Sequence, residues 1–375
     1  SSVNDQAVGA VGTANTYIGI FIIMFSVISS GMVAVMTQNI GAGRPGVAYQ
    51  ARQLGLTFNA VLGIIVSLIL TFGAGAILAG VGVADALMQP ARTYLQIVGG
   101  FCILNALIPI CSSYLRAFGF SKEPLYASII GNVINFCLNA FFLFVLHKGV
   151  AGVATATVIS RIINLVIVVL LGAVLVKAKQ HPERESNRAV MGQIIRIGLP
   201  SACETAIYNV SMTLVIRFLN QMDAQGLNVT ARSYTMQITN FSYCVGAALA
   251  QANAIMTGWH IGAKEYDACD RGTKKAAVIG VIVAVILETV FTLCSGWIMQ
   301  LFSKDPQMVS LVGKLLAIDI VLEIGRVTNL VYGQALKTSG DAVFPVVMGV
   351  CFMILCSVGG TYLFGIRLGL LAVGA

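Results

Sequence analysis

The feature that most constrains this chain is a series of ten apolar stretches, each long enough to cross a membrane as a helix. Crossing the hydrocarbon core of a bilayer takes about 20 residues of α-helix. Membrane-spanning strands would be about half as long and would alternate polar with apolar residues, which these stretches do not. They lie at about residues 10–38, 53–80, 93–118, 124–146, 150–176, 197–219, 232–258, 276–302, 312–336 and 343–364. The sequence therefore predicts an all-α polytopic membrane protein.

The composition agrees with this fold class. Hydrophobic residues make up 57% of the chain and charged residues only 10%, whereas soluble domains carry about 25% charged residues. The net charge of +8 does not require a nucleic-acid partner, because membrane proteins concentrate Lys and Arg in cytoplasmic loops. Of the 23 basic residues, 14 fall in alternate loops on one side, six in the loops between, and three inside helices. We expect a multi-pass protein of the cell membrane with the first of these sides in the cytoplasm.

Residue patterns that support catalysis or resident cofactors are missing from the sequence. The nine cysteines form no CxxC, and eight of them lie in apolar stretches, where we expect small buried hydrophobes. The three histidines are far apart, and there is no phosphate-binding glycine loop. These observations predict neither an enzyme nor a nucleotide-driven pump, and no bound metal or organic cofactor.

The two halves of the chain resemble each other at one constant displacement along the sequence. When Ile40-Gly41-Ala42 is placed on Ile261-Gly262-Ala263, Pro124 falls on Pro345 without any gap. An even number of crossings per repeat makes the halves parallel, related by an axis along the membrane normal. We expect two six-helix lobes, residues 1–180 and 181–375, whose boundary lies in the polar stretch from Lys177 to Arg196.

The repeat also predicts what a longer parent protein contains. The helix at 197–219 has no counterpart before residue 1, and only the beginning of 150–176 is matched, at 370–375. We expect a parent of twelve helices, of which this chain holds helices two to six in one lobe. The other lobe holds helices seven to eleven and the start of the twelfth.

Several short motifs resemble the multidrug and toxic compound extrusion (MATE) transporters. They are, in chain order, Thr37–Gly43, Leu115–Gly119 with Pro124, Gly131-Asn132 with Asn135, Gly149–Ala154 and Ile197–Ser201. The resemblance implies two lobes that face a central cavity and export of drugs or organic, in particular cationic, metabolites against an inward flow of Na⁺ or H⁺. It implies a small-molecule substrate, a protein that acts as a monomer in the lipid bilayer, and no nucleic-acid partner.

A lipid-linked precursor or polysaccharide flippase of the same superfamily is the alternative. Such a protein would need a cationic cavity for a pyrophosphate headgroup, and only Arg161, Arg217 and Arg326 lie inside helices.

Four acidic residues lie away from loops and helix ends: Glu204, Glu288, Asp319 and Glu323. A charge at the centre of a bilayer costs about 2.5–3.5 kcal/mol, so each is a functional candidate. The resemblance suggests a cation-coupling role for Glu204, since the family places an acid in this helix. The alternative is a carboxylate near a helix N-terminus that the helix dipole favours. For Glu288 we favour a packing or lipid-interface role over a cavity role.

The helix at 312–336 places several polar residues on one face. Glu323 and Arg326 are three residues apart and can pair; Asp319 lies one turn before them and Asn329 continues the face. Some coupled family members carry Asp where this chain has Arg326, so that carboxylate is not transferred. Two interpretations remain: a structural ion pair, or a negatively charged cavity wall for a cationic substrate.

Asn132, Asn135 and Asn139 share one face of the helix at 124–146. Certain family members carry Asn and Asp at the positions of Asn135 and Asn139. The amides either bond to neighbouring helices or line a neutral polar wall that binds cation or substrate. Because an amide does not titrate, we expect ion coupling mainly in the C-terminal lobe.

Overall fold

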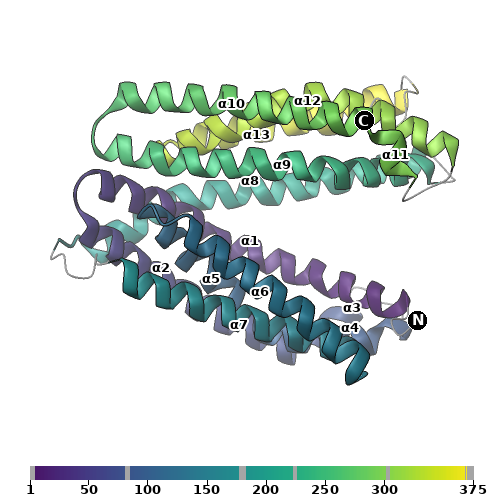
Figure 1. Cartoon of the computed structure of the whole chain (residues 1–375), viewed down its shortest axis with the longest axis horizontal. Helices are drawn as coiled ribbons and strands as arrows, with labels where there is room; N and C mark the ends of the chain where they lie inside the picture. The colour runs from purple at the N-terminus through teal and green to yellow at the C-terminus, as the bar shows by residue number, and fades with distance from the viewer. Residues whose placement is uncertain are drawn as a thin grey trace. The chain divides into compact units, whose positions relative to one another are not determined.

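The computed structural model describes residues 5–80, 85–176, 183–222, 226–300, 305–367 and 369. Across these residues it contains helices and no strands (Figure 1). The helices are α1 (Asp5–Gly41), α2 (Pro45–Phe72), α3 (Ala74–Gly80), α4 (Asp85–Gly100), α5 (Ile103–Ala117), α6 (Lys122–Ala140), the π-helical η1 (Phe141–Val145), α7 (Gly149–Leu175), α8 (Asn187–Met222), α9 (Leu227–Gly262), α10 (Tyr266–Leu293), α11 (Ser295–Met299), α12 (Pro306–Ser339), α13 (Val343–Phe352), and the π-helical η3 (Met353–Gly359) and η4 (Thr361–Arg367). The all-α fold predicted from the sequence is confirmed.

The chain divides into two compact units, Ser1–Ala202 (unit 1) and Cys203–Ala375 (unit 2). The predicted boundary between residues 180 and 181 falls outside the described residues. Helix α8 begins in unit 1 and continues without a break into unit 2. The polar stretch after residue 186 is therefore part of a long helix, rather than a segment separate from the helix expected at 197–219.

In unit 1, α1 packs against α2, α4 and α5, while α7 packs against α4, α5 and α6. Asn59 of α2 ties three of these helices together, because its Nδ2 donates to the backbone oxygens of Phe25 in α1 and Ala106 in α5, each at 3.2 Å. A core of buried apolar side chains, among them Leu70 and Leu95, fills the space between the helices. Helices α4 and α5 form a bent pair with an angle of 42° between them.

Two glycines allow the N-terminal part of α8 to cross α1 at very short range inside unit 1. A Cβ atom on Gly198 would lie 1.7 Å from the backbone oxygen of Val27, and one on Gly31 would lie 1.9 Å from that of Ile194. Neither position can hold a side chain without moving a backbone. The main-chain atoms of the two helices therefore set their separation at this crossing.

Hydrogen bonds and an ion pair join the residues around the start of α8 to those around the start of α2. Gln50 donates to the backbone oxygen of Glu185 (2.7 Å) and to Asn187 (2.6 Å), and its own oxygen accepts from the Glu185 amide (3.0 Å). Arg44 adds an ion pair with the Glu185 carboxylate at 2.5 Å. The side chain of Gln50 thus satisfies backbone groups that precede the first turn of α8.

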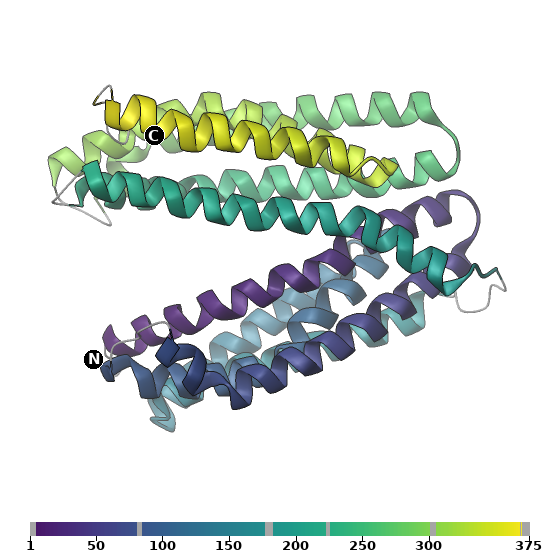
Figure 2. The same cartoon turned by 180° about the vertical axis from the view of Figure 1, so that it is seen from behind.

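In unit 2, α9, α10 and α12 run side by side around a small core that includes Ala250, Ala284 and Val327 (Figure 1). Figure 2 shows the segment from α13 to η4 beside α8, where the rings of Phe218 and Tyr362 lie 6.0 Å apart. Helix α12 begins with an Asp305 cap that accepts from the Gln307 amide, a favourable way to satisfy a free N–H group. These contacts fix the faces that α10 and α12 turn toward each other.

Helix bounds in the two units recur at one spacing. Helices α2 and α10 begin at Pro45 and Tyr266 and end at Phe72 and Leu293, so their starts and their ends are separated by the same length of chain. The starts of helices α6 and α13 are separated by that length as well. It is also the displacement at which the two halves of the sequence match.

Within the described part of the chain, six helices are long and apolar enough to cross a membrane, or seven if the bent pair α4 and α5 is one span. Helices α8, α9 and α12 have 36, 36 and 34 residues but are not among these six, so fewer than the ten expected stretches meet both criteria. The prediction of buried cysteines holds for Cys102 and Cys111 only; Cys269 is half-buried and the other six cysteines are exposed. In a membrane-spanning helix bundle, outward-facing apolar side chains contact lipid and need no internal partner.

Candidate functional site

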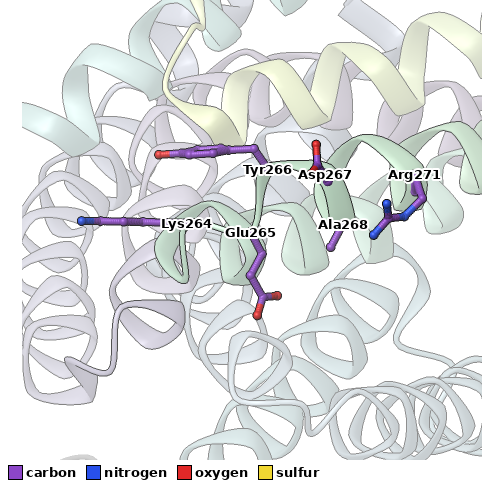
Figure 3. A pocket seen from close by; sticks show the side chains of 6 residues that line it. All are labelled: Lys264, Glu265, Tyr266, Asp267, Ala268 and Arg271. Carbon is purple, nitrogen blue, oxygen red and sulfur yellow. The ribbon is translucent and has the colours of Figure 1, made fainter.

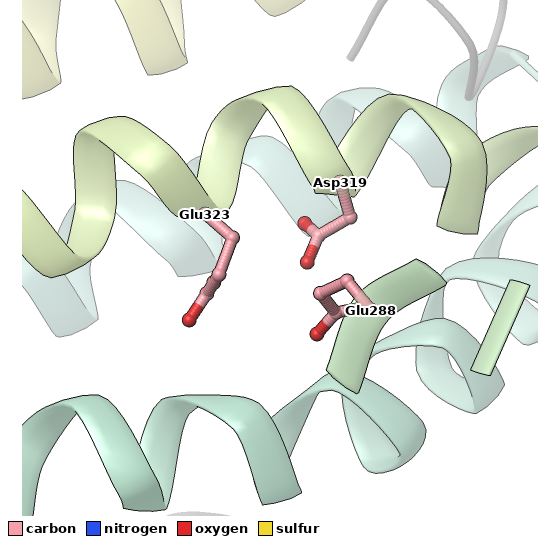
Figure 4. Close-up of side chains that lie close together, drawn as sticks. All are labelled: Glu288, Asp319 and Glu323. Carbon is pink, nitrogen blue, oxygen red and sulfur yellow. The ribbon is translucent and has the colours of Figure 1, made fainter. Parts of the chain in front are cut away.

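Three carboxylates from two helices of unit 2 meet inside the unit. Glu288 of α10 faces Asp319 and Glu323 of α12, and one oxygen from each lies within 4.8 Å of the other two (Figure 4). The exposed fractions of the three residues are 0%, 7% and 0%. The spacing of four residues between Asp319 and Glu323 puts both on the α12 face that packs on α10. We refer to these three residues as the acid cluster.

One cation neutralises part of the acid cluster. Arg326 donates from Nη1 to Glu323 Oε2 at 2.5 Å and from Nη2 to Asp319 Oδ1 at 3.1 Å. The other oxygen of Glu323 accepts from Ser242 of α9 at 3.2 Å. The Glu323–Arg326 pair expected from their spacing is present, and Arg326 bridges both α12 acids.

The remaining oxygens of the acid cluster have no such partner. Neither oxygen of Glu288, nor Oδ2 of Asp319, finds a hydrogen-bond partner among the described residues. Of the packing or lipid-interface role expected for Glu288, the lipid-interface part is wrong, because this side chain is fully buried beside two acids. The sequence offered one signal for it, a single acid in an otherwise apolar helix. Periodicity within α10 could not show that it faces α12.

Glu204 lies elsewhere in unit 2, where α8, α12 and α13 meet. Its Oε2 forms an ion pair with Lys337 Nζ at 2.5 Å, and the side chains of Glu204 and Lys337 are 21% and 13% exposed. A Cβ on Gly349 of α13 would lie 3.1 Å from Glu204 Oε1. The helix expected at 312–336 ends before Lys337, whereas α12 includes this residue, so the sequence did not predict the pair. Asn329 is exposed on α12 and does not belong to the acid cluster.

The asparagines of α6 form a neutral network in unit 1. Asn139 donates to the side-chain oxygen of Asn135 at 3.0 Å, and Asn135 donates to Ser160 of α7 at 3.3 Å. The buried Oδ1 of Asn139 has no hydrogen-bond partner among the described residues, and Asn132 is exposed. The structure thus contains the bonding to a neighbouring helix that was one of the two interpretations of these residues.

A surface pocket of about 530 Å³ lies at the turn between α9 and α10 (Figure 3). Its lining comes from consecutive or nearly consecutive residues, Lys264, Glu265, Tyr266, Asp267, Ala268 and Arg271. It is a polar hollow at one helix turn and lies apart from the predicted site residues.

The fold and its buried ionisable groups define a multi-pass membrane protein of the transporter class. The family model MatE matches residues 1–141 and 200–363, and the chain belongs to this family of multidrug and toxin extrusion transporters. The predicted resemblance is confirmed.

Individual proteins give the same result. The chain is 32% identical over 375 residues to "Uncharacterized transporter YisQ" of Bacillus subtilis (strain 168), covering 98% of this chain and 82% of that protein. It is 22% identical over 360 residues to "Probable multidrug resistance protein YoeA" of the same organism, covering 92% and 76%. A crystal structure of MATE in the straight conformation has the same fold, with a TM-score of 0.89 at 17% identity, over 99% of this chain and 83% of that one. These relatives are membrane transporters rather than enzymes.

Proposed function

We propose that this protein is a secondary active antiporter that exports drugs or organic cations in exchange for Na⁺ or H⁺. The observation that carries the proposal is the acid cluster, where three buried carboxylates face a single guanidinium group. Buried charge is costly unless it is compensated. An excess of buried acid therefore suits a protein that takes up cations during its cycle.

In this proposal the protein consists of two lobes derived from one repeat, residues 1–180 and 181–375, and the lobe boundary precedes the division between units 1 and 2. Its support is the single displacement along the chain that is common to the sequence matches and the helix bounds. The protein works as a monomer in the plasma membrane, with a small-molecule substrate and no resident cofactor. Similarity to a protein described as a multidrug resistance protein supports a drug-like substrate.

Cation and substrate binding are assigned to charged residues in unit 2 and amides in unit 1. In unit 2, Glu204 takes part in coupling and releases Lys337 when it does so, while Arg326 bridges the α12 acids and Asn329 offers an exposed amide. In unit 1, Asn135 and Asn139 contribute a neutral polar surface. The full set is Glu204, Asn135, Asn139, Asp319, Glu323, Arg326 and Asn329.

A flippase for lipid-linked precursors is not favoured. A pyrophosphate headgroup requires free cationic donors, whereas Arg326 already binds Asp319 and Glu323.

Transport in proteoliposomes tests the proposal. Efflux of a fluorescent organic cation should accelerate when an inward Na⁺ gradient or an inward H⁺ gradient is imposed, each varied separately. Glu204→Gln should abolish this acceleration while the protein still inserts into the liposomes. Efflux that ignores both gradients in the unaltered protein would contradict antiport.

A further inference from the structure

Some carboxylate oxygens of the acid cluster have a hydrogen-bond partner and others have none among the described residues. Arg326 occupies Asp319 Oδ1 and Glu323 Oε2, and Ser242 occupies Glu323 Oε1. Asp319 Oδ2 and both oxygens of Glu288 remain without hydrogen-bond partners among the described residues, although Glu288 is fully buried. Figure 4 shows the Glu288 side chain close to those of Asp319 and Glu323. A buried acid among other acids either takes up a proton or holds a cation.

We propose that Glu288, Asp319 and Glu323 form a binding site for one dehydrated alkali-metal cation, Na⁺, with Glu288 as the ligand that Arg326 leaves free. Arg326 is a permanent counter-ion of this site and lies on the α12 side of it. The inference deepens the proposed function and rests on it, because it names the residues that take the coupling ion.

The dimensions of the cluster fit an ion with long oxygen bonds. A point between three oxygens 4.8 Å apart lies about 2.8 Å from each, and small side-chain rotations would bring them near the ~2.3–2.6 Å of Ca²⁺–oxygen bonds. Mg²⁺ requires about 2.0–2.1 Å and a rigid octahedron, and Ca²⁺ takes roughly six to eight oxygens. Among the described residues, three oxygens of the cluster lack a hydrogen-bond partner, which is fewer than the roughly six to eight oxygens of a Ca²⁺ site.

The charges of the cluster also favour a bound cation. Three carboxylates and Arg326 have a net charge of −2 when all are ionised. One Na⁺ reduces this to −1. Carboxylate oxygens are hard ligands that suit alkali and alkaline-earth cations.

Equilibrium binding of ²²Na⁺ to the purified full chain in detergent tests the site without transport. At fixed pH, with choline chloride holding the ionic strength constant, the unaltered protein should bind one ion per chain. Glu288→Gln, which keeps the side-chain shape and removes the charge, should reduce binding at least tenfold. Asp319→Asn, which leaves the Glu323–Arg326 pair in place, provides a second variant with the same expected loss.

Two control variants separate the site from other acids. Asp270→Asn removes a 59% exposed carboxylate from the same helix as Glu288 and should bind as the unaltered protein does. Glu265→Gln, at a 59% exposed carboxylate that pairs with His260 before α10, should also retain binding. In choline chloride alone, Glu288→Gln should unfold at or above the temperature of the unaltered protein, because its buried negative charge is gone.

Absence of ²²Na⁺ binding in the unaltered protein would overturn the inference, as would full binding in Glu288→Gln. Loss of binding in Glu204→Gln with retention in Glu288→Gln would move the ion to α8 and overturn it as well. If binding follows the expected pattern while proteoliposomes show no Na⁺-driven efflux, the site stands and the proposed antiport fails. If proteoliposomes show Na⁺-driven efflux but Glu288→Gln binds ²²Na⁺ as the unaltered protein does, the proposed antiport stands and the proposed site fails.

Discussion

Unit 1 and unit 2 share their helix spacing but differ in the chemistry of their polar interiors. Among the described residues of unit 1, acids occur only at helix ends and in the segment before α8, and α6 carries a network of amides. Unit 2 carries an acid cluster with Arg326 and a separate Glu204–Lys337 pair. One helical framework therefore holds a network of amides in unit 1 and a cluster of buried acids in unit 2.

The energies of the two interiors differ in the same way. Hydrogen bonds between helices in a membrane are worth about 0.6 kcal/mol on average, whereas one uncompensated charge costs about 2.5–3.5 kcal/mol. Unit 2 should therefore respond strongly to substitutions that change charge, and unit 1 should respond to changes of shape.

Replacement of Arg326 should have the largest effect. Arg326→Gln leaves three buried acids without their shared counter-ion, and losing one partner of a buried ion pair costs about 3 kcal/mol. We expect little folded protein from this variant in membrane extracts, measured by fluorescence-detected size-exclusion chromatography. Glu323→Gln should reduce the yield of folded protein less, because Arg326 still forms its ion pair with Asp319.

The double variant Glu323→Gln with Arg326→Gln tests whether these residues act together. It should recover much of the yield that Arg326→Gln loses, since a charge is removed from each side. A double variant no better than the sum of the two single changes would show that the residues do not couple and would break the contrast between units.

A shape change in unit 1 should have the next largest effect. Gly198→Ala places a Cβ 1.7 Å from the Val27 backbone oxygen, and overpacking of this kind costs about 1–3 kcal/mol. Gly192→Ala is the matched control on α8, because a Cβ there meets nothing within 4 Å. Thermal unfolding of both variants in detergent should separate them clearly. Equal unfolding temperatures would mean that the crossing relaxes without cost.

The Glu204–Lys337 pair should show an intermediate effect on stability. Each single change, Glu204→Gln or Lys337→Met, removes a charge-assisted hydrogen bond worth about 1.5 kcal/mol. Both should lower the unfolding temperature, but only Glu204→Gln should abolish gradient-driven efflux. Loss of gradient dependence in Lys337→Met as well would show that coupling needs the intact pair.

The smallest effect should come from unit 1. Asn139→Ala removes one bond to Asn135 and should cost about 0.6 kcal/mol, leaving the Na⁺ and pH dependence of efflux unchanged. Asn139→Asp should add a pH dependence, because a carboxyl group titrates and an amide does not. If Asn139→Ala changed the Na⁺ or pH dependence of efflux, ion coupling would involve unit 1, and the two units would not differ in this respect.

Much of the fold could be predicted from the sequence, because long apolar stretches have few alternatives in a membrane. The bend between α4 and α5 was missed, since residues 93–118 read as one continuous apolar stretch. The start of α8 was placed at 197 instead of Asn187. Val190 and Ile194, which precede the expected start, are buried within this helix.

The site could be predicted only within single helices. The spacing of Glu323 and Arg326 predicted their ion pair, because side chains three residues apart are neighbours on one face of a helix. The contacts of Glu288 with Asp319, and of Glu204 with Lys337, join residues far apart in the chain. Such contacts depend on the rotation of each helix about its axis, and that rotation is set by packing between helices.

The Gly31–Gly198 crossing has a consequence for the mutational tolerance of this protein. Every amino acid other than glycine carries a Cβ. Any missense change in codon 31 or codon 198 therefore places this atom in a clash with the backbone of the opposing helix. Codons 19 and 192 also encode glycine in α1 and α8, yet a Cβ there meets nothing within 4 Å. In a population of random variants selected for function, the first two codons should stay invariant while the other two drift.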